Sequence, residues 1–138
     1  MTRSTHNELT SPPASILVVD DEQAILNFIR AVMDKSRRKV REASDGAAAL
    51  MVLWENYRDI ELLVTDVHMP RLDGLSLVRR ARDIVPNIKV VVTSGGVDAA
   101  ERQLIEELDV TAFLQKPFSA VAMTSCIDGI LGTNSRSQ

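Results

Sequence analysis

The chain has 138 residues, a mass of 15.2 kDa and 45% hydrophobic residues, which suffices for one domain with a buried core and leaves no room for a second. Its 16 Lys and Arg against 19 Asp and Glu give a formal net charge of −3, with no overall basic bias toward nucleic acid. The single cysteine, Cys126, excludes an internal disulfide, and no apolar run approaches the roughly 20 residues of a membrane span. We therefore expect a cytoplasmic protein that binds neither membranes nor nucleic acid directly.

The N-terminal part of the chain predicts a polar arm, a strand, an acidic turn and a helix. Residues 1–14 offer nothing to bury, so we expect a flexible arm before a domain that spans residues 15–131. The apolar residues 16–19 predict a strand that ends in Asp20-Asp21-Glu22. A helix over residues 22–35 is then predicted by apolar residues at helical spacing, Ile25, Phe28, Ile29 and Val32.

A basic cluster and a second strand-helix pair follow. We interpret the cluster from Lys35 to Lys39 as a solvated helix end, favourable beside a helix C-terminus, and not as a binding patch. Residues 40–43 predict a short strand, and Ser44-Asp45-Gly46 a turn or cap. The next helix runs through Ala47, Leu50, Met51 and Trp54, and we expect Trp54 to lie in the core and not to stack on a ligand.

Three further strands alternate with three further helices. The strands are expected over residues 60–65, 89–93 and 112–114, and the helices over residues 75–85, 98–108 and 119–131. A polar tail is expected over residues 132–138. The first of these helices must end before Pro86. Five strands alternating with five helices predict an α/β fold, in which a doubly wound, five-stranded parallel sheet is covered on both faces.

The polar residues suited to chemistry all lie just past the carboxyl end of a predicted strand. Asp20 and Asp21 follow the first strand, Asp66 the third, Ser94 the fourth and Lys116 the fifth. In open α/β sheets this is where ligands bind, at the point where the strand order reverses. Three converging carboxylates repel one another unless a cation is present, and Mg²⁺ prefers such oxygen ligands. Because a lysine and a hydroxyl suit phosphoryl oxygens, the sequence indicates Mg²⁺-dependent phosphoryl transfer.

Each of these signals is weak by itself. An Asp-Asp pair after a strand is more often a helix cap or turn than a metal site. A Lys-Pro step more often marks a loop with a solvated lysine, and Thr-Ser-Gly is usually a turn. Only their joint placement at one end of one sheet favours a phosphoryl-transfer site.

Four blocks of the sequence resemble the receiver domain of two-component response regulators. They are Val18-Val19-Asp20-Asp21, Asp66-Val67-His68-Met69-Pro70 with Asp73-Gly74, Ser94-Gly95, and Phe113-Leu114-Gln115-Lys116-Pro117-Phe118. The blocks keep the order and approximate spacing of the family, and the resemblance covers residues 15–131. It implies a flavodoxin-like (βα)5 sandwich with strand order 2-1-3-4-5, as in stand-alone chemotaxis-type receivers.

The resemblance also implies the acceptor and the metal ligands. Asp66 would be the phospho-acceptor, a carboxylate that attacks the phosphohistidine of a sensor histidine kinase or of a phosphotransfer protein. Asp21 would be the principal Mg²⁺ ligand, and Asp20 would assist largely through water. Asp66 and the backbone carbonyl of His68 would be further direct ligands. Such a protein is a signalling phospho-acceptor that catalyses only its own phosphorylation and dephosphorylation.

Sensing and switching are implied for three other positions. Lys116 would pair with the phosphoryl group, and Ser94 would hydrogen-bond to it, with Thr93 as the rival for that role. In the family this hydroxyl moves toward the phosphoryl group, and the aromatic residue of the fifth strand, here Phe113, turns inward. The alternative is that Phe113 is simply a core aromatic. Phe113 also lacks the hydroxyl of tyrosine-bearing relatives.

His68 and Gly96 occupy two positions that vary in the family and are associated with access of water to the acyl phosphate. We expect the imidazole of His68 to border the site and not to bind metal, because Mg²⁺ prefers oxygen. A bulky His68 would block or order water, while Gly96 leaves space for it. The lifetime of the phosphoryl group is therefore left open.

Output depends on surfaces that the sequence identifies only in part. The last helix carries one charge, Asp128, which is few for a helix with a solvent face, so we expect it to join a partner or a homodimer. The chain is either a stand-alone receiver or one cut from a longer regulator with a DNA-binding or enzymatic output domain.

Two other functions fit the sequence less well. A haloacid dehalogenase-type phosphohydrolase would want an aspartate where His68 stands. A flavodoxin-like protein would want a Ser/Thr-rich loop where Asp20-Asp21-Glu22 stands.

Overall fold

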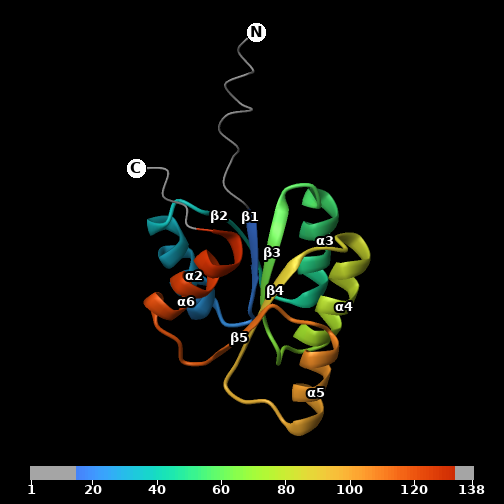
Figure 1. The fold of residues 1–138 in the computed structure, drawn as a ribbon. Helices are drawn as coiled ribbons and strands as arrows, with labels where there is room; N and C mark the ends of the chain where they lie inside the picture. The colour runs from blue at the N-terminus through green and yellow to red at the C-terminus, as the bar shows by residue number, and fades with distance from the viewer. Residues whose placement is uncertain (1–14, 133–138) are drawn as a thin grey trace.

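The computed structural model describes residues 15–132, which form a five-stranded parallel sheet with helices on both faces (Figure 1). The strands are β1 (Ser15–Val19), β2 (Lys39–Ala43), β3 (Ile60–Asp66), β4 (Lys89–Ser94) and β5 (Ala112–Gln115). They pair in the order β2-β1-β3-β4-β5, and every pair is parallel. The predicted fold class and strand order are therefore confirmed.

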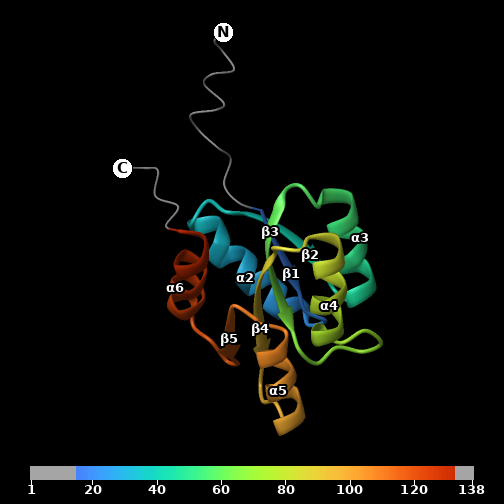
Figure 2. The same ribbon diagram turned by 45° about the vertical axis from the view of Figure 1, so that its right-hand side comes forward.

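Helices cover both faces of this sheet within the described residues. They are α2 (Gln23–Lys35), α3 (Gly46–Asn56), α4 (Gly74–Ile84), α5 (Ala99–Glu107) and α6 (Ala120–Leu131). Figure 2 shows α2 and α6 on one face and α3, α4 and α5 on the other. All strands run in one direction, so the sheet has a carboxyl end, where every strand finishes, and an amino end, where every strand starts.

The interior strand β1 shows why both faces of the sheet are apolar. Leu17 and Val19 belong to the core under α3 and α4, and Ile16 and Val18 to the core under α2 and α6. Side chains of a strand alternate between the two faces, so a strand covered on both sides must be apolar at every position. None of these four side chains is more than 1% exposed.

Short polar side chains set where the helices begin. Asp45 accepts a hydrogen bond from Ala48 N at 2.8 Å at the start of α3, which confirms the predicted cap. Asp73 does the same for α4 through Ser76 N, also at 2.8 Å. Each cap satisfies a backbone N–H group that has no partner within its own helix. The helices on this face of the sheet therefore start at defined residues beside its carboxyl end.

The placement of Trp54 in the core is wrong. The side of α3 that faces the sheet carries Gly46, Ala49 and Leu53, whereas Trp54 is 67% exposed and Met51 is 59% exposed. The helix is apolar on nearly all sides, so its composition gives no clear indication of which side is buried. The small residues Gly46 and Ala49 let α3 lie close to its neighbours, and the bulky ones point outward.

The apolar residues whose spacing predicted α2 do not all lie in the core. Its buried residues are Leu26, Ile29, Val32 and Met33. Phe28 is instead 38% exposed and has its ring centroid 6.1 Å from that of Phe118 in the β5–α6 loop. Ile29 and Val32 thus face the core, and Phe28 lies on the flank of the helix.

The interpretation of the basic cluster as fully solvated is wrong for Arg38. Its side chain is 3% exposed, and Nη2 lies 3.0 Å from Asp128 Oδ1 near the end of α6. Nη2 also donates to the carbonyl of Gly132, which follows the last turn of α6. Arg38 therefore ties α6 to the amino end of β2. Lys35, in the last turn of α2, fits the predicted helix end.

The predicted domain limits, residues 15–131, remain a prediction. The expected arm over residues 1–14, and all of the expected tail except Gly132, lie outside the described residues. Among residues 15–132, no helix combines the length and the apolar character needed to cross a membrane.

Candidate phosphoryl-transfer site

Three aspartates meet at the carboxyl end of the sheet. Asp20 and Asp21 follow β1 and Asp66 ends β3, the strand beside it. One carboxylate oxygen from each lies within 4.8 Å of the others. Asp20 and Asp66 are buried, at 1% and 6% exposure, while Asp21 is exposed. The predicted convergence of these residues is thus present, with one side of the cluster open to solvent.

Lys116 is the cation of this cluster. From the residue after β5, its Nζ reaches Asp20 Oδ2 at 2.9 Å and Asp66 Oδ2 at 3.5 Å. Glu22 Oε1 lies 3.8 Å away on the solvent side. The other carboxylate oxygen of Asp20 accepts a hydrogen bond from Glu22 N at 2.9 Å. The buried Asp20 is therefore fixed on both sides and holds the lysine against Asp66.

The protonation of Asp66 and Lys116 is shaped by this arrangement. Burial raises the pKa of Asp66, Lys116 opposes that effect and Asp20 adds to it, so the net shift is upward. Burial would lower the pKa of Lys116, but the hydrogen bond with Asp20 and the surrounding carboxylates outweigh it and raise the pKa. Lys116 is thus held in its charged form beside a carboxylate that is costly to ionise.

The backbone of Asp66 is clamped by a glycine. Gly74 N donates to Val67 O at 2.8 Å, and a Cβ built on Gly74 would lie 1.9 Å from the carbonyl oxygen of Asp66. No side chain fits in that space. The start of α4 therefore rests directly on the backbone that presents the Asp66 carboxylate.

Ser94 ends β4 beside this cluster. Its hydroxyl donates to Gly96 O at 2.7 Å and accepts from Gly96 N at 3.0 Å. The neighbouring Thr93 pairs with Asp66 in the register of β3 and β4 and is 2% exposed. The Ser94 hydroxyl is thus engaged with its own loop.

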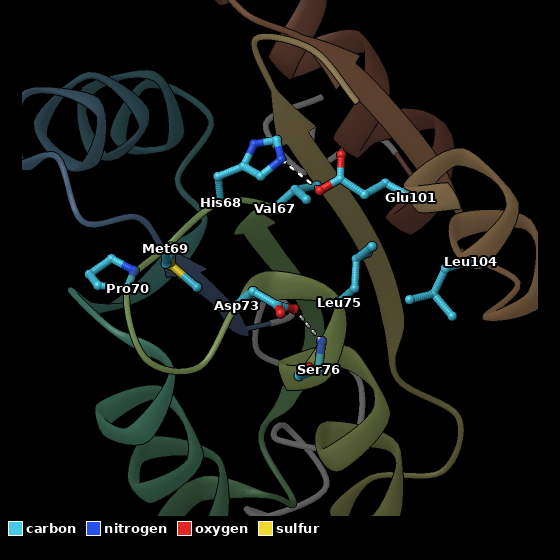
Figure 3. Close-up of a pocket in the computed structure, with 9 residues that line it drawn as sticks. All are labelled: Val67, His68, Met69, Pro70, Asp73, Leu75, Ser76, Glu101 and Leu104. Carbon is cyan, nitrogen blue, oxygen red and sulfur yellow. Dashed lines mark hydrogen bonds and ion pairs between the residues drawn. The ribbon is translucent and has the colours of Figure 1, made fainter. Parts of the chain in front are cut away.

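The imidazole of His68 points toward Glu101 of α5 (Figure 3). Its Nε2 lies 2.8 Å from Glu101 Oε2, and its Nδ1 lies 3.4 Å from the Ser94 hydroxyl. The other oxygen of Glu101 accepts from Asp98 N at 2.9 Å, which completes the capping box of α5. The imidazole thus bridges the loop after β3 to the start of α5.

A cavity of about 490 Å³ lies beneath this bridge. Val67, Leu75 and Leu104 supply apolar walls, and His68 and Glu101 lie at its rim (Figure 3). The cavity separates the loop after β3 from α5, so the contact between His68 and Glu101 spans a gap and not a packed interface.

Phe113 lies on β5 and is 36% exposed, so it is a partly exposed aromatic and not a fully buried one. The simple core alternative therefore does not describe the conformation seen here. Its predicted role as a switch remains a prediction.

The model of the response regulator receiver domain matches residues 16–128. The chain belongs to this family. Among curated relatives of the receiver, the sensor kinase CckA of Brucella abortus is 34% identical over 88% of this chain and 13% of its own length. The DNA-binding transcriptional regulator NtrC of Azospirillum brasilense is 32% identical over 88% of this chain and 25% of its own. The response regulator MprA of Mycobacterium sp. (strain KMS) is 34% identical over 78% of this chain and 46% of its own length.

Solved structures of receivers are similar over nearly their whole length. A response regulator receiver domain protein from Clostridium thermocellum is 28% identical with a TM-score of 0.80, over 91% of this chain and 99% of that one. The receiver domain of the hybrid histidine kinase CckA is 31% identical with a TM-score of 0.73, over 86% and 99%. This chain thus contains a receiver domain, and it spans 13 to 46% of the three curated relatives.

Receiver domains bind Mg²⁺ at an acidic site, and the cluster of this receiver fits such an ion. Its three carboxylates offer oxygen ligands within 4.8 Å of one another, and the exposed Asp21 leaves one side accessible. The imidazole of His68 contacts Glu101, and hard oxygen ligands remain the suitable donors.

Two contacts of this receiver were not anticipated from the sequence. Glu22 beside Lys116 was visible only as the continuation of Asp20-Asp21, and its contact depends on the position of β5. Glu101 beside His68 is 33 positions away in the chain and has no local signal. Both contacts are products of the tertiary fold.

Proposed function

We propose that this receiver takes a phosphoryl group onto Asp66 from a sensor histidine kinase or a phosphotransfer protein, and then signals through protein contacts. The observation that carries the proposal is Lys116 Nζ, 2.9 Å from Asp20 and 3.5 Å from Asp66, inside a group of three converging aspartates. A positioned cation beside an acceptor carboxylate is the arrangement that in-line phosphoryl transfer requires.

In the proposed reaction, an Asp66 carboxylate oxygen attacks the phosphorus of a phosphohistidine. The new O–P bond forms as the P–N bond breaks. The electron pair of the P–N bond stays on the imidazole nitrogen of the donor histidine, which is the leaving group. Attack of water on the phosphorus later releases inorganic phosphate and restores the carboxylate. Lys116 stabilises the charge that spreads over the phosphoryl oxygens.

The residues proposed to hold Mg²⁺ are Asp21 and Asp66, with the backbone carbonyl of His68, while Asp20 assists. When bound, the cation offsets the repulsion between the carboxylate and the incoming phosphoryl group. The exposure of Asp21 supports its place on the side from which the donor arrives. The burial of Asp20 supports a different task, which is to hold Lys116.

The proposed switch begins with Ser94. Its hydroxyl is bonded to Gly96 at 2.7 Å, and it must leave this partner to reach a phosphoryl oxygen. Phe113, 36% exposed on the adjacent strand, would turn into the space that is vacated. Thr93 is the alternative hydroxyl, and its burial in the sheet makes it the less suitable one.

Output is proposed to run through protein partners, either directly or through further domains. The relatives named NtrC and CckA are longer proteins whose receivers accompany other parts, so an attached DNA-binding or enzymatic output is the second possibility. Val121 on α6 is 74% exposed, which supports the last helix as a contact surface. A monomer in solution scattering, both with and without a phosphoryl mimic, would count against a homodimer through α6.

The deciding experiment is incubation with acetyl phosphate and Mg²⁺, followed by intact-protein mass spectrometry. We expect a mass increase of one phosphoryl group that depends on Mg²⁺ and is lost in Asp66→Asn. Asp83→Asn, which changes an exposed carboxylate on α4, is the matched control and should keep the adduct. Absence of an adduct in the native protein under all conditions would overturn the proposal.

A further inference from the structure

Glu101 uses both of its carboxylate oxygens, and the two contacts fix its side chain. It is the third residue of α5, and one oxygen accepts from the backbone N–H of Asp98 at 2.9 Å, within the capping box. The other oxygen lies 2.8 Å from Nε2 of His68 (Figure 3). An ionised carboxylate only accepts, so Nε2 carries a proton in this contact. The neutral ring can carry its proton there and the charged ring always does, so the contact does not depend on the charge of His68.

The imidazole of His68 depends on this contact for its orientation. The side chain is 54% exposed, and the cavity of about 490 Å³ lies beneath the bridge to Glu101. A side chain between solvent and a hollow can occupy several staggered rotamers unless a polar contact selects one. The second contact of the ring joins Nδ1 to the Ser94 hydroxyl over 3.4 Å and is the weaker of the two. Glu101 therefore determines where the ring lies.

The two residues after Ser94 supply no bulk beside the phosphoryl-transfer site. A Cβ on Gly95 or on Gly96 would meet nothing within 4 Å in the described part of the chain, so this loop borders open space. The ring of His68 comes to the same place from the loop after β3, with one side toward the Ser94 hydroxyl and the other toward solvent. It is thus the bulky group where a phosphoryl group bonded to Ser94 would face water.

Loss of the phosphoryl group by hydrolysis requires a water molecule at this border. The water oxygen attacks the phosphorus from the side opposite to the Asp66 oxygen, and the bond between phosphorus and that oxygen breaks. The electron pair of this bond returns to the carboxylate, and both protons of the water remain on inorganic phosphate. A ring held beside Ser94 narrows the approach of the water, whereas a ring turned into solvent leaves it open.

We propose that Glu101 is a positioning residue that prolongs the lifetime of the phosphoryl group, because it holds the imidazole of His68 beside Ser94. This inference rests on the proposed function, since it concerns the release of the phosphoryl group from Asp66. Glu101 acts through the ring alone. Its removal should therefore speed the release of the phosphoryl group and leave its uptake unchanged.

The test follows the decay of the adduct by intact-protein mass spectrometry, with Mg²⁺ present and acetyl phosphate removed. We expect Glu101→Ala and His68→Ala each to lose the adduct at least about threefold faster than the native protein, because a ring spread over three rotamers, or an absent ring, no longer narrows the approach. The double variant should decay no faster than His68→Ala, since two residues that act through one ring are not additive. Glu101→Ala should form the adduct at the native rate.

Two control variants separate the bridge from the helix cap and from the charge of α5. Asp98→Ala removes the side-chain cap of the same turn and keeps the backbone N–H that binds Glu101. Glu106→Ala removes an exposed carboxylate from the same helix. Both variants should keep the native lifetime of the adduct.

Four results would overturn the inference. A native or longer lifetime in Glu101→Ala would do so and leave the proposed function intact. Equal acceleration in Asp98→Ala would assign the effect to the helix cap. A further acceleration when Glu101→Ala is added to His68→Ala would give Glu101 a role apart from the ring. A native protein that forms no adduct would overturn the proposed function and this inference together.

Discussion

A cation with little exposed surface lies at each end of the sheet, and the two are satisfied in different ways. At the amino end, Arg38 contacts one carboxylate, Asp128, and the carbonyl of Gly132 just after α6. At the carboxyl end, Lys116 faces Asp20, Asp66 and Glu22, so one positive charge stands among three negative ones. The first site is balanced as it stands. The second is left with an excess of negative charge, and a bound cation would complete it.

This difference separates stability from function. A balanced buried pair holds two elements together and gains nothing from a ligand. An unbalanced group of charges is costly to keep in a fold, and it responds to any charged group that arrives. We therefore expect substitutions at the amino end to change the free energy of unfolding, and substitutions at the carboxyl end to change reactivity. Four predictions test this contrast.

The largest effect is expected from Gly74→Ala, at the carboxyl end. The added Cβ would lie 1.9 Å from the carbonyl of Asp66, so β3 and α4 must move apart, at a cost of about 3 kcal/mol or more in unfolding free energy. Urea unfolding measures this, and adduct formation with acetyl phosphate should fall as well. Gly95→Ala is the control, because its Cβ meets nothing within 4 Å. Equal stability of the two variants would contradict the clamp on Asp66.

Next in size is Lys116→Met, which should slow adduct formation about 10²-fold, the usual loss when one donor to a developing charge is removed. The variant leaves Asp20 and Asp66 buried without the cation that contacts both. Added Mg²⁺ should therefore raise its melting temperature more than that of the native protein. An unchanged phosphorylation rate would remove Lys116 from the reaction.

Arg38→Met should show the reverse pattern. We expect a loss of roughly 2 kcal/mol in unfolding free energy, because α6 loses its tie to β2 while Asp128 is near enough to water to be solvated. Within residues 15–132 the Arg38 Nε has no hydrogen-bond partner, which limits the loss. The rate of phosphorylation should stay the same. Lys39→Met, at an exposed pair with Asp59, should cost less than about 0.5 kcal/mol.

The smallest effect concerns the pH dependence of Asp66→Asn. Burial raises the pKa of Asp66 in the folded protein, so its ionised form costs stability above that raised pKa. The cost shrinks as the pH falls through the raised pKa and is gone below 3.8, the usual pKa of the group, where the side chain is protonated in the folded and the unfolded protein. With a chelator present, Asp66→Asn should melt above the native protein at pH 7, and the gap should close toward pH 4. A lower melting temperature of the variant at pH 7 would contradict this.

The strand ends were predictable because they combine two strong local signals. An apolar run followed directly by a carboxylate, as at Val64, Thr65 and Asp66, indicates both a buried strand and its exit. Parallel strands bring such exits together, so the convergence of Asp20, Asp66 and Lys116 follows from topology. The distances between them do not follow, because they depend on the packing of five strands.

The predictions that failed concern features that depend on tertiary packing and not on local sequence signals. Trp54 lies on a helix with apolar residues on nearly every side, so their periodicity does not indicate which side is buried. The buried side is the one that carries the small residues Gly46 and Ala49, because these allow close packing. Arg38 looked like part of a solvated cluster, and its partner, Asp128, is 90 positions away. His68 and Glu101 are similarly distant. Long-range partners of charged residues leave no local trace.

The position of β1 between β2 and β3 has a consequence for the order in which the protein can form. Residues 15–19 leave the ribosome first, yet their two neighbours in the sheet are residues 39–43 and 60–66. A nascent chain that pairs β1 with β3 before β5 is made would bring Asp20 and Asp66 together without Lys116. A nascent chain that ends ahead of β5 must hold these aspartates without the lysine, so divalent cations should favour its early folding. The charge imbalance that makes the finished site reactive would also make synthesis of the domain sensitive to the ions around it.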